Sequence, residues 1–449
     1  MLTYDPVLYS RILTEVTLAF HIIFATIGVG VPLMIALAQW VGIKKQDPHY
    51  ILLARRWARG FVITVAVGVV TGTAIGLQLS LLWPSFMELA GQVISLPLFM
   101  ETFAFFFEAI FLGIYLYTWD RFKNQMKHLL LLIPVVIGSS MSAVFITIVN
   151  AFMNTPQGFE LKDGAIVSIE PLVAMFNPAM PTKVSHVLAS AYMTSAFVLA
   201  SIAAYRMLRG SKHVYHRKAL HLTLVSALVF SVATAVIGDF SGKFLAEYQP
   251  EKLAAAEWHF ETSDRAPLIL FGTLDENNEV KNGIKIPYAL SILAHNNPTA
   301  EVTGLNETPV DERPPLYIHY LFDLMVSIGM LLTVLALIYV VLYKRKNSNP
   351  YRKSMLMSIW LSGPLAILAI ELGWIFAEVG RQPWILRGYM KTSEGATTAP
   401  YVDVMLLFFI ALYIGLAIVS TTVLRRMFKN NTVEKEIEQM NEEQEVSRV

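Results

Sequence analysis

Residues 12–40 read ILTEVTLAFHIIFATIGVGVPLMIALAQW, and this stretch decides the class of fold. About twenty apolar residues in a helix cross the roughly 30 Å hydrocarbon core of a bilayer, and this run is longer than that. Its backbone amides need partners within the segment, which a helix provides. Asp5 and Arg11 precede it without the basic region of a signal peptide, so we expect the helix to be retained.

Runs of this kind recur along the whole chain. Hydrophobic residues make up 55% of the sequence and charged residues only 15%, which leaves too little polar surface for a water-soluble protein of this size. The alternating pattern of a membrane barrel strand is absent. We therefore predict an all-α, polytopic membrane bundle of nine transmembrane helices at 12–40, 60–83, 96–117, 129–152, 184–205, 220–237, 316–343, 355–377 and 402–423.

Lys and Arg residues are concentrated in alternate connections, which sets the expected orientation. The basic connections lie at 44–59, 121–127, 206–218 and 344–353, whereas 84–95 has no basic residue and 151–183 has only Lys162 and Lys183. Since basic loops face the cytoplasm, the N-terminus is predicted outside and the C-terminus inside.

The expected organisation has four parts: six helices in 1–239, an outward loop in 240–315, three helices in 316–424 and a charged cytoplasmic tail in 425–449. A loop as long as 240–315 is usually functional or disordered. Within it, 241–263 is predicted to be a helix, and 275–283 and 296–315 turn-rich coil. We expect the tail to be solvated and partly helical.

Several costly polar side chains fall inside the predicted spans, where each calls for a functional hypothesis. Taken singly, each has an ordinary explanation; Met325, for example, is one of nineteen methionines. The topology nevertheless places an imidazole pair, a thioether and several carboxylates at comparable depth in the outer half of the bundle. They are His21, His186, Met325, Glu101, Glu108, Glu371 and Glu378. A bound metal or haem iron would explain this gathering, because His and Met are ligands of low-spin haem.

Several classes of protein can be excluded. The absence of cysteine excludes thiolate-ligated haem and iron–sulfur clusters, and a net charge of +1 gives no basic field for nucleic acid. The histidines are too few for a haem–copper oxidase and lack the paired spacing of a bc-type cytochrome b. A haem-less cation or proton-coupled transporter that uses His21, Glu101, Glu108 and Glu378 remains the alternative, although Pro134 and Pro364 are only weak signs of broken helices.

Residues 373–384 read GWIFAEVGRQPW. This segment resembles the Gly-Trp-x-x-x-Glu-x-Gly-Arg-Gln-Pro-Trp signature of cytochrome bd quinol oxidase subunit I. The resemblance extends over nearly the whole chain, through the helix at 10–21, the sequence GDFSG at 238–242, the sequence KLAAAE at 252–257, and His186 and Met325.

The resemblance implies three haems, two of b type and one haem d. His186 and Met325 would ligate the low-spin b haem, while His21 and Glu378 would each ligate one of the two high-spin haems. Which of these two residues serves haem d is left open, as is a variant that carries only b haems. Trp374 would lie among the haems as a packing or electron-relay residue, and Arg381 would pair with a propionate.

The resemblance also implies a quinol site and a proton route. Lys252 and Glu257 would contact quinol in the outward loop, which lacks the long insertion of some family members, with Glu257 accepting a hydroxyl proton. Glu101, Glu108 and Ser140 would carry protons from the cytoplasm to the oxygen site without a pump.

The expected function is therefore that of the haem-bearing subunit of an electrogenic terminal oxidase in the bacterial cytoplasmic membrane. It would oxidise quinol at the outer face and reduce dioxygen to water. A second membrane subunit and a small single-span subunit are the implied partners, and no nucleic acid is expected. The sequence leaves the identity of the quinone open.

Overall fold

The computed structural model describes residues 4–446 and confirms the predicted helical bundle. Nine of its described helical segments are long and apolar enough to cross a membrane. They are α1 (Pro6–Lys45), α2 (Pro48–Leu82), α3 (Pro84–Tyr117), the pair α4 (Gln125–Leu129) and α5 (Leu132–Asn154), α7 (Met180–Leu208), α8 (Val214–Tyr248), α11 (Ile318–Lys344), α12 (Lys353–Val379) and α14 (Val402–Asn430).

Local sequence signals explain where the first helices begin. The side chain of Asp5 accepts from the amides of Val7 and Leu8 at the start of α1, and Asp47 caps α2 in the same way. Prolines occupy the first turns of α1, α2 and α3, where no amide donor is needed. The predicted connection at 84–95 is wrong, because Pro84 starts α3 directly after Trp83 and these residues extend the helix.

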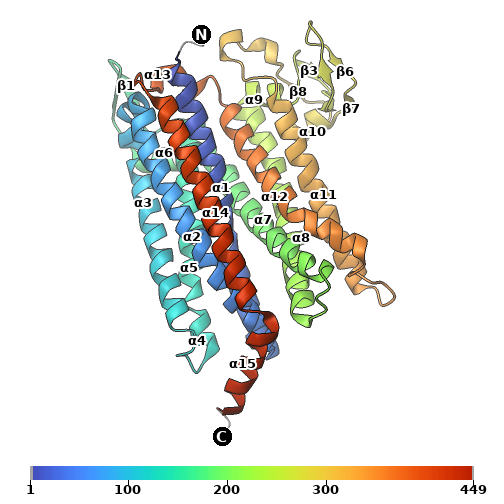
Figure 1. Cartoon of the computed structure of the whole chain (residues 1–449). Helices are drawn as coiled ribbons and strands as arrows, with labels where there is room; N and C mark the ends of the chain where they lie inside the picture. The colour runs from blue at the N-terminus through green and yellow to red at the C-terminus, as the bar shows by residue number, and fades with distance from the viewer. Residues whose placement is uncertain (1–3, 447–449) are drawn as a thin grey trace.

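The spans form two groups in Figure 1, with α1, α2, α3, α5 and α14 in one and α7, α8, α11 and α12 in the other. Helices α1 and α7 join the groups at a close contact, where Ser195 donates to the carbonyl of Thr26 at 3.1 Å. A Cβ on Gly30 would lie 2.3 Å from the Ser195 oxygen, so glycine is required there. Small residues at such crossings are typical of membrane helix packing.

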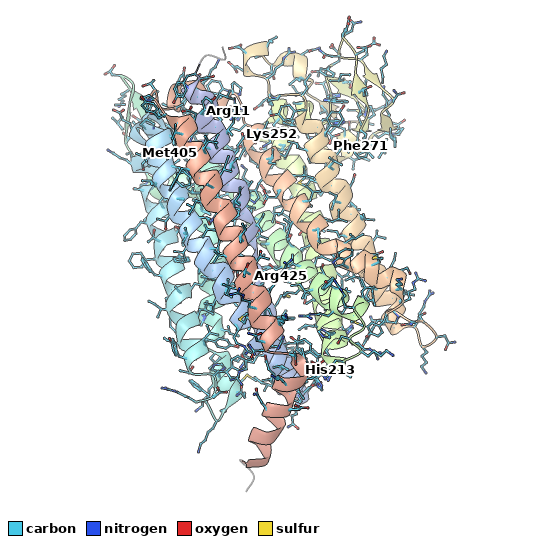
Figure 2. All side chains as sticks on the ribbon, in the orientation of Figure 1. Arg11, His213, Lys252, Phe271, Met405 and Arg425 are labelled. Atoms are coloured by element: carbon cyan, nitrogen blue, oxygen red, sulfur yellow. The ribbon has the colours of Figure 1, made fainter. Side chains whose placement is uncertain are left out.

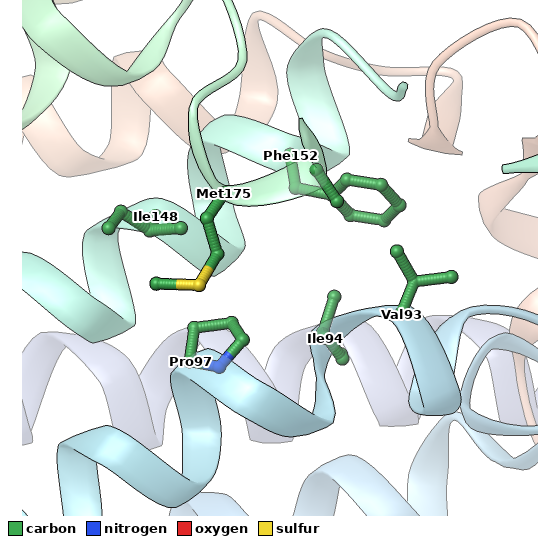
Figure 3. A pocket seen from close by; sticks show the side chains of 7 residues that line it. Val93, Ile94, Pro97, Ile148, Phe152 and Met175 are labelled. Atoms are coloured by element: carbon green, nitrogen blue, oxygen red, sulfur yellow. The ribbon is translucent and has the colours of Figure 1, made fainter. Parts of the chain in front are cut away.

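Apolar side chains both fill the interior and face outward. Large exposed residues line one side of α3, among them Phe99, Phe103, Phe106 and Ile110, as expected for a surface in lipid. Where α3, α5 and α6 (Pro171–Met175) meet, Ile94, Phe152 and Met175 pack together, leaving no space for a water molecule (Figure 3).

The long outward loop differs from its predicted limits. Helix α8 runs past Asp239 to Tyr248, and the helix expected at 241–263 is the end of α8 followed by α9 (Pro250–Ala256). The stretch 275–283 is mostly turn and coil, as predicted: 275–279 connect β5 to β6, and only residues 280–281 are in a strand. The loop further contains β3 (Ser263–Asp264), β4 (Leu268–Leu270), β5 (Thr273–Leu274), β6 (Val280–Lys281), β7 (Ile284–Ile286), α10 (Ala289–His295), β8 (Glu301–Val302), η1 (Leu305–Glu307) and η2 (Val310–Glu312).

The strands pair antiparallel, β3 with β8, β4 with β7 and β5 with β6, and all lie at one end of the bundle (Figure 1). Smaller pairs occur in two other connections, β1 (Glu160–Lys162) with β2 (Ala165–Val167), and β9 (Trp384–Leu386) with β10 (Met390–Lys391) ahead of α13 (Thr392–Gly395). The strands are confined to connections, so the all-α class holds.

The charged tail is more ordered than predicted. Helix α14 continues to Asn430, and α15 (Val433–Val446) lies at the end of the bundle opposite the long loop (Figure 1). Glu436 is buried and accepts from Arg56 at 2.7 Å and from Arg59 at 2.5 Å. The expectation of a solvated tail is therefore wrong for this residue, and 447–449 lie outside the described residues.

Candidate functional site

His21 is held in a defined orientation by α2. Its Nδ1 lies 2.8 Å from the hydroxyl oxygen of Thr71, and that hydroxyl donates to the backbone carbonyl of Val67. When the Thr71 hydroxyl donates to Val67, its oxygen can accept from His21 Nδ1, and in that tautomer Nε2 is free as a ligand. A hydrogen bond from the second ring nitrogen is the usual way in which a metal-binding histidine is oriented.

His186 and Met325 belong to the second group of helices. His186 is on α7 near Gly238 of α8, and its buried Nδ1 has no hydrogen-bond partner. The sulfur of Met325 on α11 faces Gly373 of α12, where a Cβ would come within 2.9 Å. The structure thus places both predicted ligands in one four-helix group, with the backbone of Gly373 directly against the thioether.

These surroundings suit haem better than a bare metal ion. Among the described residues, no three His, Cys, Asp or Glu side chains gather as they would around an ion held by protein alone. Haem iron needs only one or two axial ligands from the protein. A buried imidazole nitrogen without a partner and a thioether facing a glycine fit such axial ligation.

Glu378 lies in a partly buried charged cluster at the end of α12, in which Arg381 is buried and the Glu378 side chain is 25% exposed. One of its oxygens accepts from Arg381 at 2.8 Å, and the other accepts from the amide nitrogen of Asn150. Lys183 donates to the same Asn150 side chain at 2.8 Å. The Nη1 of Arg381 is buried without a partner, so this guanidinium can still bind an anionic group such as a propionate.

Lys252 reaches this cluster from the outward loop. Its ammonium group donates to the carbonyl oxygen of Ala377 at 3.0 Å and lies 4.7 Å from the ring centre of Phe376. Burial lowers the pKa of Lys252 to about 7, and the neighbouring charge of Arg381 acts in the same direction. Figure 2 shows Lys252 at the end of the bundle that carries the loop, far from His213 at the other end.

Glu257 follows directly after α9 and is fully buried. Burial raises the pKa of Glu257 well above the usual range, and the charge of Asp323 raises it further. The nearby amide of Ile269 lowers this pKa, although it is not placed to form a hydrogen bond with the carboxylate. Neither carboxylate oxygen has a hydrogen-bond partner among the described residues. Because α9 ends at Ala256, Lys252 and Glu257 do not share one helix, and Lys252 instead contacts α12.

Two of the predicted proton carriers are linked to neighbours that sequence reasoning missed. Glu101 accepts from Ser142 at 2.9 Å, and Ser140 lies 2.7 Å from the hydroxyl of Tyr192. Glu108 is 5% exposed, and its Oε1 has no partner. Helices α3 and α5 approach closely beside it, since a Cβ on Gly138 would lie 2.9 Å from the Glu108 amide.

Trp374 and Glu371 occupy half-buried positions on α12, and Glu371 has a buried oxygen without a partner. Sequence reasoning did not single out Thr71, Asn150 or Lys183. Asn150 had a usable signal, because an amide side chain within an apolar span needs a partner. An open groove of about 490 Å³ along α7 and α8, lined in part by Phe240 and Phe244, contains none of the predicted site residues.

Comparisons with known proteins show the family of this chain. The family model of cytochrome bd terminal oxidase subunit I matches residues 9–432. Two proteins of Bacillus subtilis (strain 168) are similar to the chain. A putative cytochrome bd menaquinol oxidase subunit I is 44% identical over 96% of this chain and 99% of the relative. A cytochrome bd ubiquinol oxidase subunit 1 is 32% identical over 86% and 85%. The solved structure of the bd oxidase from Geobacillus thermodenitrificans has a TM-score of 0.92 and 74% identity, covering 96% of this chain and 100% of that one.

Proposed function

Since this chain belongs to the cytochrome bd terminal oxidase subunit I family, it is a subunit of a quinol:oxygen oxidoreductase, and we propose the residues through which it acts. Membership of the family implies haem cofactors, a quinol substrate and a second membrane subunit, and a location in the bacterial cytoplasmic membrane. The alternative of a haem-less transporter has no support. We further propose a small single-span subunit as a partner.

We propose that His186 and Met325 would hold a low-spin b haem, and that His21 and Glu378 would hold a second b haem and haem d. When bound, the haems take electrons from quinol and deliver them to dioxygen. The partnerless nitrogen of His186 and the free Nε2 of His21 support their roles. Trp374 would pack beside these groups, and Arg381 would hold a propionate through its unpaired nitrogen.

Quinol oxidation is assigned to Lys252 and Glu257 at the outer face. Glu257 can take the hydroxyl proton of quinol because burial gives its carboxylate a high proton affinity. Lys252, when protonated, stabilises the negative charge that develops on the quinol oxygen. The end of the bundle that carries the loop then faces outward, and α15 faces the cytoplasm, in agreement with the basic residues near α15.

Protons for oxygen reduction are proposed to pass from the cytoplasm through Ser140, Glu108 and Glu101. Tyr192 and Ser142 extend this set, since their hydroxyl groups lie within hydrogen-bond distance of Ser140 and Glu101. Inward movement of these protons towards electrons from the outer face separates charge without a pump.

The observation that carries the proposal is the hydrogen bond from Lys252 to Ala377, because it joins the quinol loop to the segment that holds Glu378. The test is a dithionite-reduced minus air-oxidised spectrum of the purified complex, with haem extraction. A far-red band and two b haems for each chlorin-type haem are expected. If the extract contains b haem alone, a b haem takes the place of haem d and the assignment of quinol oxidation stands. An absence of haem would overturn the proposal.

A further inference from the structure

His319, on the first turn of α11, is completely buried, and both of its ring nitrogens face acceptors. Nδ1 lies 2.7 Å from the carbonyl oxygen of Ala256, and Nε2 lies 3.2 Å from the carbonyl oxygen of Phe271. Nε2 is also 3.3 Å from the carboxylate of Asp323, one turn further along α11. Both ring nitrogens of His319 thus lie within hydrogen-bond distance of backbone carbonyls, and the Asp323 carboxylate lies beside Nε2.

His319 and Asp323 bind two separate parts of the outward loop to α11, the first arm at 256–258 and the second arm at Phe271. The first arm, 256–258, is held through the Ala256 carbonyl and through Trp258, whose ring stacks on His319 with centroids 3.9 Å apart. The second arm is held at Phe271, whose amide donates to Asp323 at 2.5 Å. Figure 2 shows Phe271 at the loop end of the bundle.

Glu257 lies between Ala256 and Trp258, the two residues of the first arm that contact His319. Its carboxylate has no hydrogen-bond partner of its own, so its place depends on the backbone on either side. Trp258 has a φ of 47°, in the left-handed region that a bulky aromatic residue rarely adopts. Such a conformation persists only where surrounding contacts hold it. The stack on His319 and a 2.9 Å hydrogen bond from Trp258 Nε1 to Leu316 provide those contacts.

We propose that His319 and Asp323 are positioning residues for quinol oxidation, which hold the Glu257 carboxylate at the quinol and tie it to the helix that carries Met325. This inference rests on the proposed role of Glu257. His319 makes no direct contact with substrate in it. The pair acts through the backbone of 256–258, and a small displacement of a reacting group can reduce turnover by about a hundredfold.

The test compares His319→Gln and Asp323→Asn with His295→Gln in the purified oxidase. His295 is exposed on α10 of the same loop, so it is a matched control. We expect quinol-driven kcat to fall about tenfold to a hundredfold in the first two variants. Oxygen consumption with an artificial one-electron donor, which needs no proton acceptor, should stay within twofold of the unaltered enzyme. Amide hydrogen exchange in 256–272 should become faster, and His295→Gln should change none of these quantities.

Glu257→Gln separates this inference from the proposed function. If Glu257→Gln abolishes quinol oxidation while His319→Gln and Asp323→Asn stay within twofold, the positioning role is wrong and the role of Glu257 stands. If Glu257→Gln retains turnover, the proposed role of Glu257 as proton acceptor is itself wrong. Loss of haem and of donor-driven turnover in both His319→Gln and Asp323→Asn would also overturn the inference, because it would assign the pair to folding alone.

Discussion

Lys252 donates a 3.0 Å hydrogen bond to the carbonyl oxygen of Ala377, the residue directly before Glu378. One residue comes from the outward loop and the other from the end of α12, 125 positions later in the chain. The outward loop therefore contacts the segment that carries a proposed haem ligand. Any change that moves the Lys252 side chain should disturb both sites.

Gly380→Ala should displace Lys252 without removing it. A Cβ at residue 380 would lie 2.5 Å from Lys252 Cε and 2.6 Å from the carbonyl oxygen of Phe376, so something must shift. We expect quinol-driven oxygen consumption to fall about tenfold or more. Gly113→Ala is the control, because nothing lies within 4 Å of its added Cβ. Equal rates in both variants would contradict a role for the position of Lys252.

The pH dependence of quinol binding should follow Lys252. Its pKa is lowered to about 7 by burial, so the ammonium form predominates below that pH and is lost above it. If the charge assists quinol, KM should rise as the pH increases from 6 to 8. Steady-state kinetics on Lys252→Met should give a KM that is higher and independent of pH in this range. A KM in the variant that still rises through pH 7 would assign the titration to another group.

Thr71→Val should remove the hydrogen bond that orients the His21 ring. The substitution keeps the shape of the side chain but removes the oxygen that accepts from His21 Nδ1. Loss of such a supporting hydrogen bond typically weakens metal binding or activity by about tenfold to a hundredfold. Reduced-minus-oxidised spectra should show less high-spin haem, with the low-spin band unchanged. Thr73→Val removes only an exposed hydroxyl bonded within its own helix and should leave the spectrum intact.

Glu436→Ala should destabilise the end of the bundle that carries α15. Arg56 and Glu436 are both buried, and removing the carboxylate leaves the guanidinium with the carbonyl of Asn431 as a remaining partner. The expected loss is about 3 kcal/mol, measured as a lower thermal unfolding midpoint of the purified complex. Glu434→Ala, at an exposed position on the same helix, should change it little. A midpoint equal to that of the control would show that the tail does not contribute to stability.

Much of the architecture was predictable because a membrane restricts the choices. Apolar runs of spanning length must be helices, so nine segments and their approximate limits followed from hydropathy alone. The stretch at 84–95 was predicted to be a connection between helices, whereas Pro84 takes the first position of α3, a position to which proline is suited. The tail was misjudged because its charge suggested solvent, while its partner Arg56 is 380 positions away.

The family and the candidate ligands also came from the sequence, through the segment at 373–384 and the polar residues within the spans. Only the tertiary structure decided which side chains assist them: Thr71 with His21, Asn150 with Glu378, Lys252 with Ala377, and His319 with Asp323 and two arms of the loop. Periodicity tells which face of a helix a residue occupies. It does not tell which neighbouring helix lies against that face or at what height, and a hydrogen bond depends on both.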